Sequence, residues 1–109
     1  MNKKMSKKQS KPQKTTYKLY IFRPDGTADI RSTGKTKILK QLQEAVGGFV
    51  QNAGYVSDYF GSAVGWKKHF TDDAVILVNE IGRCLELKPN KCFPEFVGNV
   101  AVISREALN

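Results

Sequence analysis

The stretch that decides the fold is residues 17–32, "YKLYIFRPDGTADIRS". A run rich in aromatic and branched residues leads into Pro-Asp-Gly at 24–26, and a second short run follows. Proline presets φ, aspartate tolerates tight geometry, and glycine takes the positive φ of a G1 bulge. The stretch therefore predicts a β-hairpin with strands at about 17–23 and 27–32.

The two faces of this hairpin are expected to differ in character. One face is predicted to carry Leu19 and Ile21, with Ala28 and Ile30 opposite them. The other is predicted to carry aromatic and charged side chains together: Lys18, Tyr20, Phe22, Thr27, Asp29 and Arg31. One hypothesis is that this face stacks on and neutralises nucleic acid. The favoured alternative is that Tyr20 and Phe22 are packed by another element or in a homodimer, because large apolar groups of small domains usually find cover.

The next stretch, "STGKTKILKQLQ", contains the last third of a phosphate-binding loop. Such a loop needs G-x-x-x-x-G-K-[ST] between a strand and a helix, and Asp29 occupies the place of the first glycine. We therefore interpret Gly34-Lys35-Thr36 as the start of a helix, with Ser32 and Thr33 capping that helix. A helix N-terminus beside lysines attracts anions weakly, which makes a candidate anion site of Gly34, Lys35 and Thr36.

Further elements follow from periodicity and turn residues. Apolar residues at helical spacing predict a helix at about 36–46, ended by Gly47-Gly48. The remaining segments predict a strand at 49–56, a long irregular loop at about 57–73, a buried strand at 74–78, a turn at 79–82, a strand at 83–88, a short helix at 91–95 capped by Asn90, and a closing strand at 99–104. Gly48 and Gly82 are expected at positions of positive φ.

This order of elements predicts an α+β fold. The expected sheet is mostly antiparallel and is built from two hairpins and a closing strand, with one main helix packed on one face. Residues 16–109 are expected to form a single domain. Residues 1–15 are expected to be a disordered basic tail, because they are rich in Lys, Ser, Gln and Pro.

The net charge of +8 is unevenly distributed along the chain. Of the 18 basic residues, six are lysines of the tail, which has no acidic residue: Lys3, Lys4, Lys7, Lys8, Lys11 and Lys14. One interpretation is an arm that binds phosphates and releases counterions. The other is a leader that only keeps the chain in solution. The sequence has no apolar run long enough for a membrane span and no secretory signal.

A second candidate site lies in the 57–73 loop, "SDYFGSAVGWKKHFTDD". A base, a phosphate or an acidic partner is a candidate ligand for Tyr59, Trp66, Lys67, Lys68 and His69. The favoured alternative is that Trp66 and Phe70 pack into the core. Catalysis, cofactors and a metal site are not expected, because a lone histidine and two separated cysteines supply too few partners.

Several short blocks within about 17–104 together form a pattern: Val46, Gly47, Gly48, Phe49 and Val50; Asn79, Glu80 and Gly82; Leu87 and Asn90; and Gly98, Asn99 and Val100. This pattern resembles that of a family of domains of unknown function found in bacteriophages, in large DNA viruses of algae and in their hosts. The 53–72 segment is longer than the family pattern, and the basic tail is additional. The resemblance implies a viral origin and an accessory role, and it supplies no catalytic residues.

These observations lead to three hypotheses of function. The first is a non-enzymatic viral or phage accessory protein that binds nucleic acid non-specifically through its arm. The second is a protein-binding module, such as a virion component or an inhibitor of a host factor. The third and weakest is a binder of a small phosphorylated ligand. The expected location is the host cytoplasm or nucleus, or the virion, without secretion or membrane insertion.

Overall fold

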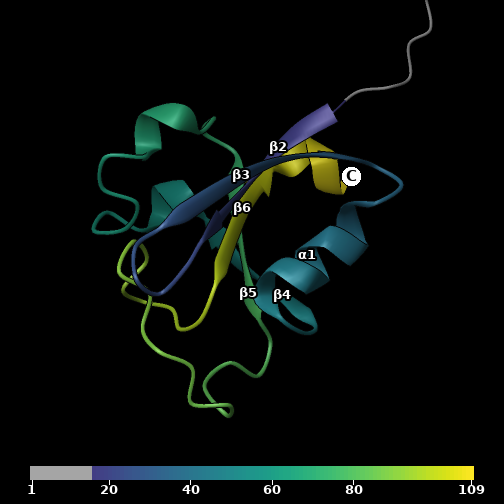
Figure 1. Cartoon of the computed structure of the whole chain (residues 1–109). Helices are drawn as coiled ribbons and strands as arrows, with labels where there is room; N and C mark the ends of the chain where they lie inside the picture. The colour runs from purple at the N-terminus through teal and green to yellow at the C-terminus, as the bar shows by residue number, and fades with distance from the viewer. Residues whose placement is uncertain (1–15) are drawn as a thin grey trace, which may run out of the picture.

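A computed structural model describes residues 16–109, which form one antiparallel five-stranded sheet with one α-helix in that part of the chain (Figure 1). The strand order across the sheet is β3-β2-β6-β5-β4, and all neighbouring strands are antiparallel. The strands are β2 (Thr16–Phe22), β3 (Ala28–Gly34), β4 (Val50–Tyr55), β5 (Ala74–Asn79) and β6 (Val100–Ser104). The prediction of an α+β fold with a mostly antiparallel sheet is confirmed.

The predicted hairpin at 17–32 is formed by β2 and β3. The N–H of Arg23 donates to the carbonyl of Thr27, and the N–H of Gly26 donates to the carbonyl of Arg23, both at 2.9 Å. Gly26 has a φ of 93°, as a G1 bulge requires. Asp25 accepts two hydrogen bonds from Thr27, and these bonds lower the pKa of its carboxyl group. The turn chemistry therefore acts as expected from the sequence.

The predicted pairing of side chains across this hairpin is wrong. Arg31 lies opposite Leu19, and Ile30 lies opposite Tyr20. Because residues that face each other across a ladder share a face, Arg31 lies on the opposite face from Tyr20. The reason is the bulged loop, which pairs Arg23 with Thr27 and so sets the register of every later pair.

The second predicted hairpin does not form, because residues 83–88 are not a strand. Both edges of β5 are already paired, one with β4 and the other with β6. Residues 80–86 instead form successive turns, in which the N–H of Leu85 donates to the carbonyl of Ile81. The alternation of apolar and polar residues in this segment therefore has no strand partner.

The helix α1 (Ile38–Val46) begins two residues later than predicted and has no side-chain cap. Ser32 and Thr33 belong to β3, so the prediction that they cap the helix is wrong. Thr33 is buried, and its hydroxyl instead hydrogen-bonds to the side chain of Gln41. The predicted C-terminus is confirmed, since the N–H groups of Gly47 and Gly48 both donate to the carbonyl of Gln43.

Positive φ occurs at Gly47 and Gly98, with values of 81° and 74°, and not at the predicted Gly48 and Gly82. At Gly48 and Gly82, neighbouring side chains lie so close that there is little room for a Cβ atom. A Cβ on Gly48 would lie 3.0 Å from Nδ2 of Asn79, and one on Gly82 would lie 3.2 Å from a methyl group of Val97. These two positions therefore favour glycine for space and not for backbone conformation.

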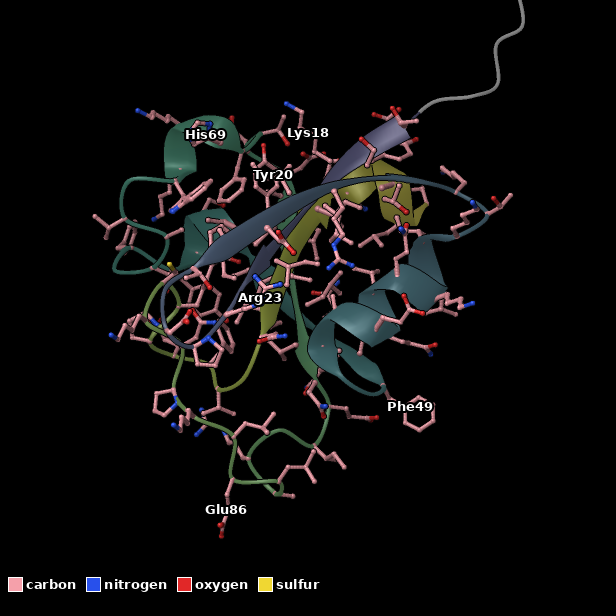
Figure 2. All side chains as sticks on the ribbon, viewed as in Figure 1. Lys18, Tyr20, Arg23, Phe49, His69 and Glu86 are labelled. Atoms are coloured by element: carbon pink, nitrogen blue, oxygen red, sulfur yellow. The ribbon has the colours of Figure 1, made fainter. Side chains whose placement is uncertain are left out.

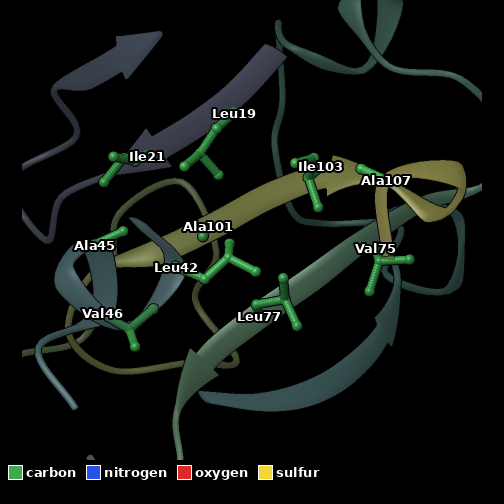
Figure 3. Packing of buried hydrophobic residues seen from close by; sticks show 10 residues of the cluster. All are labelled: Leu19, Ile21, Leu42, Ala45, Val46, Val75, Leu77, Ala101, Ile103 and Ala107. Carbon is green, nitrogen blue, oxygen red and sulfur yellow. The ribbon is translucent and has the colours of Figure 1, made fainter. Parts of the chain in front are cut away.

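The sheet is covered on both faces, which gives two hydrophobic cores. On the first face α1 packs against β5 and β6 (Figure 3). This core consists of Leu19, Ile21, Leu42, Ala45, Val46, Val75, Leu77, Ala101, Ile103 and Ala107. The residues of β5 alternate between the two faces, and all six are buried. The prediction of a strand buried on both faces is confirmed.

The second face is covered by the irregular segments that follow β4 and precede β6. This core consists of Tyr20, Phe22, Val56, Ala63, Ala74, Ile76, Val78, Phe93, Val100 and Val102, with Tyr59, Trp66, Phe70 and Phe96 packed at its border. The loop predicted at 57–73 contains two short 3-10 helices, η1 (Val56–Asp58) and η2 (Lys67–His69). A third, η3 (Arg105–Leu108), follows β6. Within residues 16–109, no helix is long and apolar enough to span a lipid bilayer.

Candidate nucleic-acid interface

The six tail lysines lie outside the described residues, but the place where the tail joins the sheet is defined. Thr16 is the first described residue and begins β2. It lies opposite Gly34, the last residue of β3. The ladder places Ser104 and Ala74 at the same end of the sheet. The tail sequence therefore joins the molecule at this end, beside the start of α1.

Exposed basic residues of the folded part gather at this end. Lys18 and His69 lie near one another (Figure 2). Both line a cavity of about 150 Å³ together with Phe70, Thr71 and Ser104. Five exposed basic residues lie in the segments nearest to this end of the sheet, and we call them the basic end: Lys18, Lys35, Lys37, Lys68 and Arg105. These five residues are accompanied by four acidic ones: Asp58, Asp72, Asp73 and Glu106.

The charge count shows how the net charge divides between the tail sequence and the folded part. The basic end has five basic and four acidic side chains, a net charge of +1, and the tail that joins it adds six lysines. The remaining described residues contain seven basic and six acidic side chains, also a net charge of +1. Most of the net charge of +8 therefore belongs to the tail sequence.

Tyr20 and Phe22 do not form an open stacking surface. Their side chains are 8% and 0% exposed. The ring centroid of Tyr20 lies 4.9 Å from that of Phe70, and that of Phe22 lies 5.1 Å from that of Trp66. These edge-on aromatic contacts are typical of a packed core. The hypothesis that bases stack on Tyr20 and Phe22 is therefore wrong, and packing by another element is confirmed.

Arg31 is exposed, but it does not join Lys18 in a common surface. It lies on the face covered by α1 and donates to Oδ2 of Asp29 at 3.2 Å. Arg23 donates to the same oxygen at 2.9 Å. Both arginines hold the pKa of Asp29 below its ordinary value. Arg31 therefore belongs to a surface ion-pair cluster at the edge of the sheet.

Of the residues predicted to form a ligand loop, some pack against the folded part and others are exposed to solvent. Trp66 packs against the second core, and Tyr59 packs against Phe96 with its hydroxyl donating to the carbonyl of Ala53. Lys67 donates to the carbonyl of Tyr59 at 2.7 Å, which fixes the loop. Lys68 and His69 remain exposed. The packing of Trp66 and Phe70 into the core is confirmed.

The residues of the predicted anion site do not form a phosphate-binding loop. Gly34 is the last residue of β3, and the ammonium group of Lys35 donates to the carbonyl of Asn109. Thr36 is exposed in the turn before α1. No side-chain or backbone arrangement here resembles the cradle of a nucleotide phosphate. Lys35 instead contributes its charge to the basic end.

One cavity was missed by sequence reasoning. It has a volume of about 350 Å³ and lies where β4 and β5 meet the turns after β5, with Gln51, Glu80, Arg83, Cys84 and Phe96 in its lining. The segment "NEIGRC" was predicted to be a hairpin, so its side chains were not considered together. Among residues 16–109, no group of three or more His, Cys, Asp or Glu side chains is placed to hold a metal ion.

Comparisons with protein-family models, curated proteins and solved structures found no match. The resemblance to a viral and phage family, which rests on short sequence blocks, therefore stays a prediction. The blocks themselves have structural roles. Asn79 binds the carbonyl of Val46 at the end of α1 and accepts from the N–H of Ile81, and Asn90 holds the segment before β6.

Proposed function

We propose that this protein binds nucleic acid without sequence preference, through its basic tail and the basic end of the folded part. The observation that supports this proposal is that most of the net charge belongs to the tail sequence, which joins the sheet beside the basic end. Phosphate groups attract such a surface by release of counterions, and no base-reading side chain is required. The proposal includes the non-enzymatic, viral accessory role that the sequence resemblance implies.

The burial of the aromatic residues sharpens this proposal. With Tyr20 and Phe22 inside the core, neither ring is open to stack on a base beside the lysines of the basic end. Binding is then expected to depend on charge alone. Double-stranded molecules, which have the higher phosphate density, should bind at least as tightly as single-stranded ones, and a change of base sequence should have little effect.

The test is the binding of fluorescent DNA and RNA at several salt concentrations. The full chain is expected to bind with steep salt dependence, and a variant lacking residues 1–14 is expected to lose most of its affinity. Each lysine that contacts duplex phosphate adds about 0.9 to the salt slope. Absence of binding by the full chain near physiological salt would exclude the proposal.

Matched substitutions separate the basic end from charge in general. Lys18→Gln with Lys68→Gln removes two lysines from the basic end, and Lys88→Gln with Lys91→Gln removes two from the opposite end. The latter two lie by the hairpin turn, since a Cβ on Gly26 would contact Lys91 and Lys88 lines a cavity together with Pro24. Both double variants have equal net charge. We expect only the first to lower the affinity and the salt slope.

A protein-binding role is a second candidate, and one observation favours it. Phe60 and Val64, in the loop between η1 and η2, are 92% and 80% exposed. Isolated exposed apolar residues are common, but two on one loop tip are typical of a contact site. Salt separates the two roles, because apolar contacts persist at high salt while phosphate contacts weaken. Phe60→Ser with Val64→Ser should then abolish a protein contact that survives high salt.

A further inference from the structure

The two edge strands of the sheet differ in how they are protected. β3 is seven residues long and pairs with β2 in an unbroken register from Phe22–Ala28 to Thr16–Gly34. Within residues 16–109, no strand pairs with its other side. Ile30, at its centre, is 53% exposed. An unbroken, partly apolar, unpaired edge is a template for another strand.

The opposite edge, β4, is interrupted. Its pairing with β5 shifts register between Asn52 and Tyr55, which marks a bulge or irregularity, and Gly54 there has a φ of 105°. The side chain of Asn52 accepts from the N–H of Gly54 at 2.8 Å, so that this N–H is already bonded. Bulges of this kind protect an edge from further pairing. Only β3 therefore offers a regular ladder of free backbone groups.

The geometry of the hairpin fixes which groups of β3 point outward. Arg23 and Thr27 form the hydrogen-bonded pair that closes the turn. Bonded and non-bonded pairs alternate along an antiparallel ladder. Asp29, Arg31 and Thr33 therefore direct their N–H and C=O groups toward β2. The backbone groups directed to the free edge are those of Ala28, Ile30 and Ser32.

We propose that β3 pairs antiparallel with β3 of a second copy of this chain, with the two-fold axis passing between the two Ile30 residues. The two Ile30 residues form one hydrogen-bonded pair. Ala28 of each copy forms another with Ser32 of the other copy. The two sheets then join into one continuous sheet, in which the exposed Ile30 side chains meet across the axis.

The charges on β3 fit this register. With Ile30 opposite Ile30, Asp29 of one copy lies opposite Arg31 of the other in a non-bonded pair, where side chains approach most closely. Within one copy Arg31 already donates to Asp29. The four side chains then form a ring of alternating sign on the face that carries α1. A pairing shifted by two residues would lose this match, so the charges select both the partner and the register.

The experiment measures the mass of the nuclease-treated full chain by sedimentation velocity and by light scattering at moderate salt. Concentrations run from about 1 μM to about 1 mM, the range of weak to moderate association. The wild type is expected to shift from monomer to dimer within this range. Ile30→Lys, which places two like charges at the axis, is expected to weaken dimerisation by at least about tenfold. Leu39→Lys is the control, since Leu39 is similarly exposed, at 58%, but lies on α1.

A charge exchange tests the register directly. Asp29→Arg alone places four positive side chains around the axis, and Arg31→Asp alone places four negative ones, so each variant is expected to be monomeric. When the two variants are mixed, one copy presents two positive side chains and the other two negative ones. The mixture is expected to regain dimers, all of them heterodimers. The variant carrying both substitutions is also expected to dimerise.

Three results would overturn the proposal. The first is a wild type that stays monomeric over the whole concentration range. The second is a dimer that is unaffected by Ile30→Lys, which would place the interface elsewhere. The third is a mixture of the two charge variants that fails to associate while circular dichroism shows both to be folded.

Discussion

Asn90 connects three separate parts of the chain with one side chain. It is 1% exposed, and its Nδ2 donates to the carbonyls of Phe22 and Gly98 at 2.9 Å each. Its Oδ1 accepts from the N–H groups of Cys92 and Phe93. The sequence predicted that Asn90 caps a helix at 91–95; that helix does not form, and Asn90 instead binds the backbone of an irregular segment. The amide is needed because it donates and accepts at once.

We expect Asn90→Ala to lower the free energy of unfolding by about 2–4 kcal/mol, because four backbone groups lose their partner in a buried site. Asn90→Asp has the same shape but cannot donate to the two carbonyls when ionised, so it should also be strongly destabilising. Asn99→Ala is the control, since Asn99 donates only to the carbonyl of Ala45. It should cost about 1 kcal/mol. Urea denaturation measures the free energy of unfolding of all three variants. Equal losses for Asn90→Ala and Asn99→Ala would refute the role of Asn90 in connecting three parts of the chain.

The two cysteines should differ in reactivity. Cys84 is exposed, whereas Cys92 is partly buried, and burial raises the pKa of its thiol. A raised pKa leaves less thiolate at a given pH, and the thiolate is the reactive form. Iodoacetamide at mildly alkaline pH is therefore expected to label Cys84 before Cys92, and the rate at Cys92 should rise with pH. Peptide mass spectrometry follows both sites, and faster labelling of Cys92 would contradict the described burial.

At the scale of elements, the sequence predicts local structure well where turn chemistry and periodicity agree. The hairpin of β2 and β3 and the glycine end of α1 follow from Pro-Asp-Gly and from Gly47-Gly48. The prediction of a strand at 83–88 is wrong because the alternation of apolar and polar residues does not show whether a neighbouring strand has a free edge. The predicted start of α1 is wrong because residues 32–34 belong to β3 and pair with β2. That pairing joins residues distant in the sequence, which a local pattern does not show.

Two glycines allow backbone strain to be separated from crowding. Both Gly47 and Gly98 have positive φ, but a Cβ would meet nothing within 4 Å at Gly47 and would lie 2.6 Å from Cδ1 of Leu87 at Gly98. We expect Gly47→Ala to cost about 1 kcal/mol and Gly98→Ala to cost about 2–4 kcal/mol. Adding Leu87→Ala to Gly98→Ala should recover part of the difference. Thermal unfolding measures these costs, and equal values at the two glycines would exclude crowding.

At the scale of the whole molecule, one sheet separates two cores of different composition. The buried residues of the core under α1 are aliphatic, whereas the other core combines aliphatic residues with a cluster of aromatic rings and is called the aromatic core. The candidate site was only partly predictable. Charge counting located the tail, but the placement of Lys18 beside His69 and the burial of Tyr20 depend on contacts that span about fifty residues of sequence.

Because the two cores share β2, β5 and β6, we expect them to unfold together. Trp66 is the only tryptophan and packs against the ring of Phe22, so its fluorescence reports the aromatic core. Far-ultraviolet circular dichroism reports the sheet and α1. The two signals should follow one transition in urea, with the same midpoint and slope. An earlier fluorescence transition would show that the irregular cover of the aromatic core opens by itself.

If two copies pair through β3 as proposed, the irregular β4 edge sets how far self-association can proceed. A sheet with two regular edges can add copies at both sides and grow into a fibre, whereas this sheet can add a copy only at β3. Once two β3 strands have paired, each outer boundary of the joined sheet is a β4 strand with its break at Asn52 and Tyr55. Assembly through strand pairing therefore closes at two copies, and high protein concentration should yield dimers and no filaments.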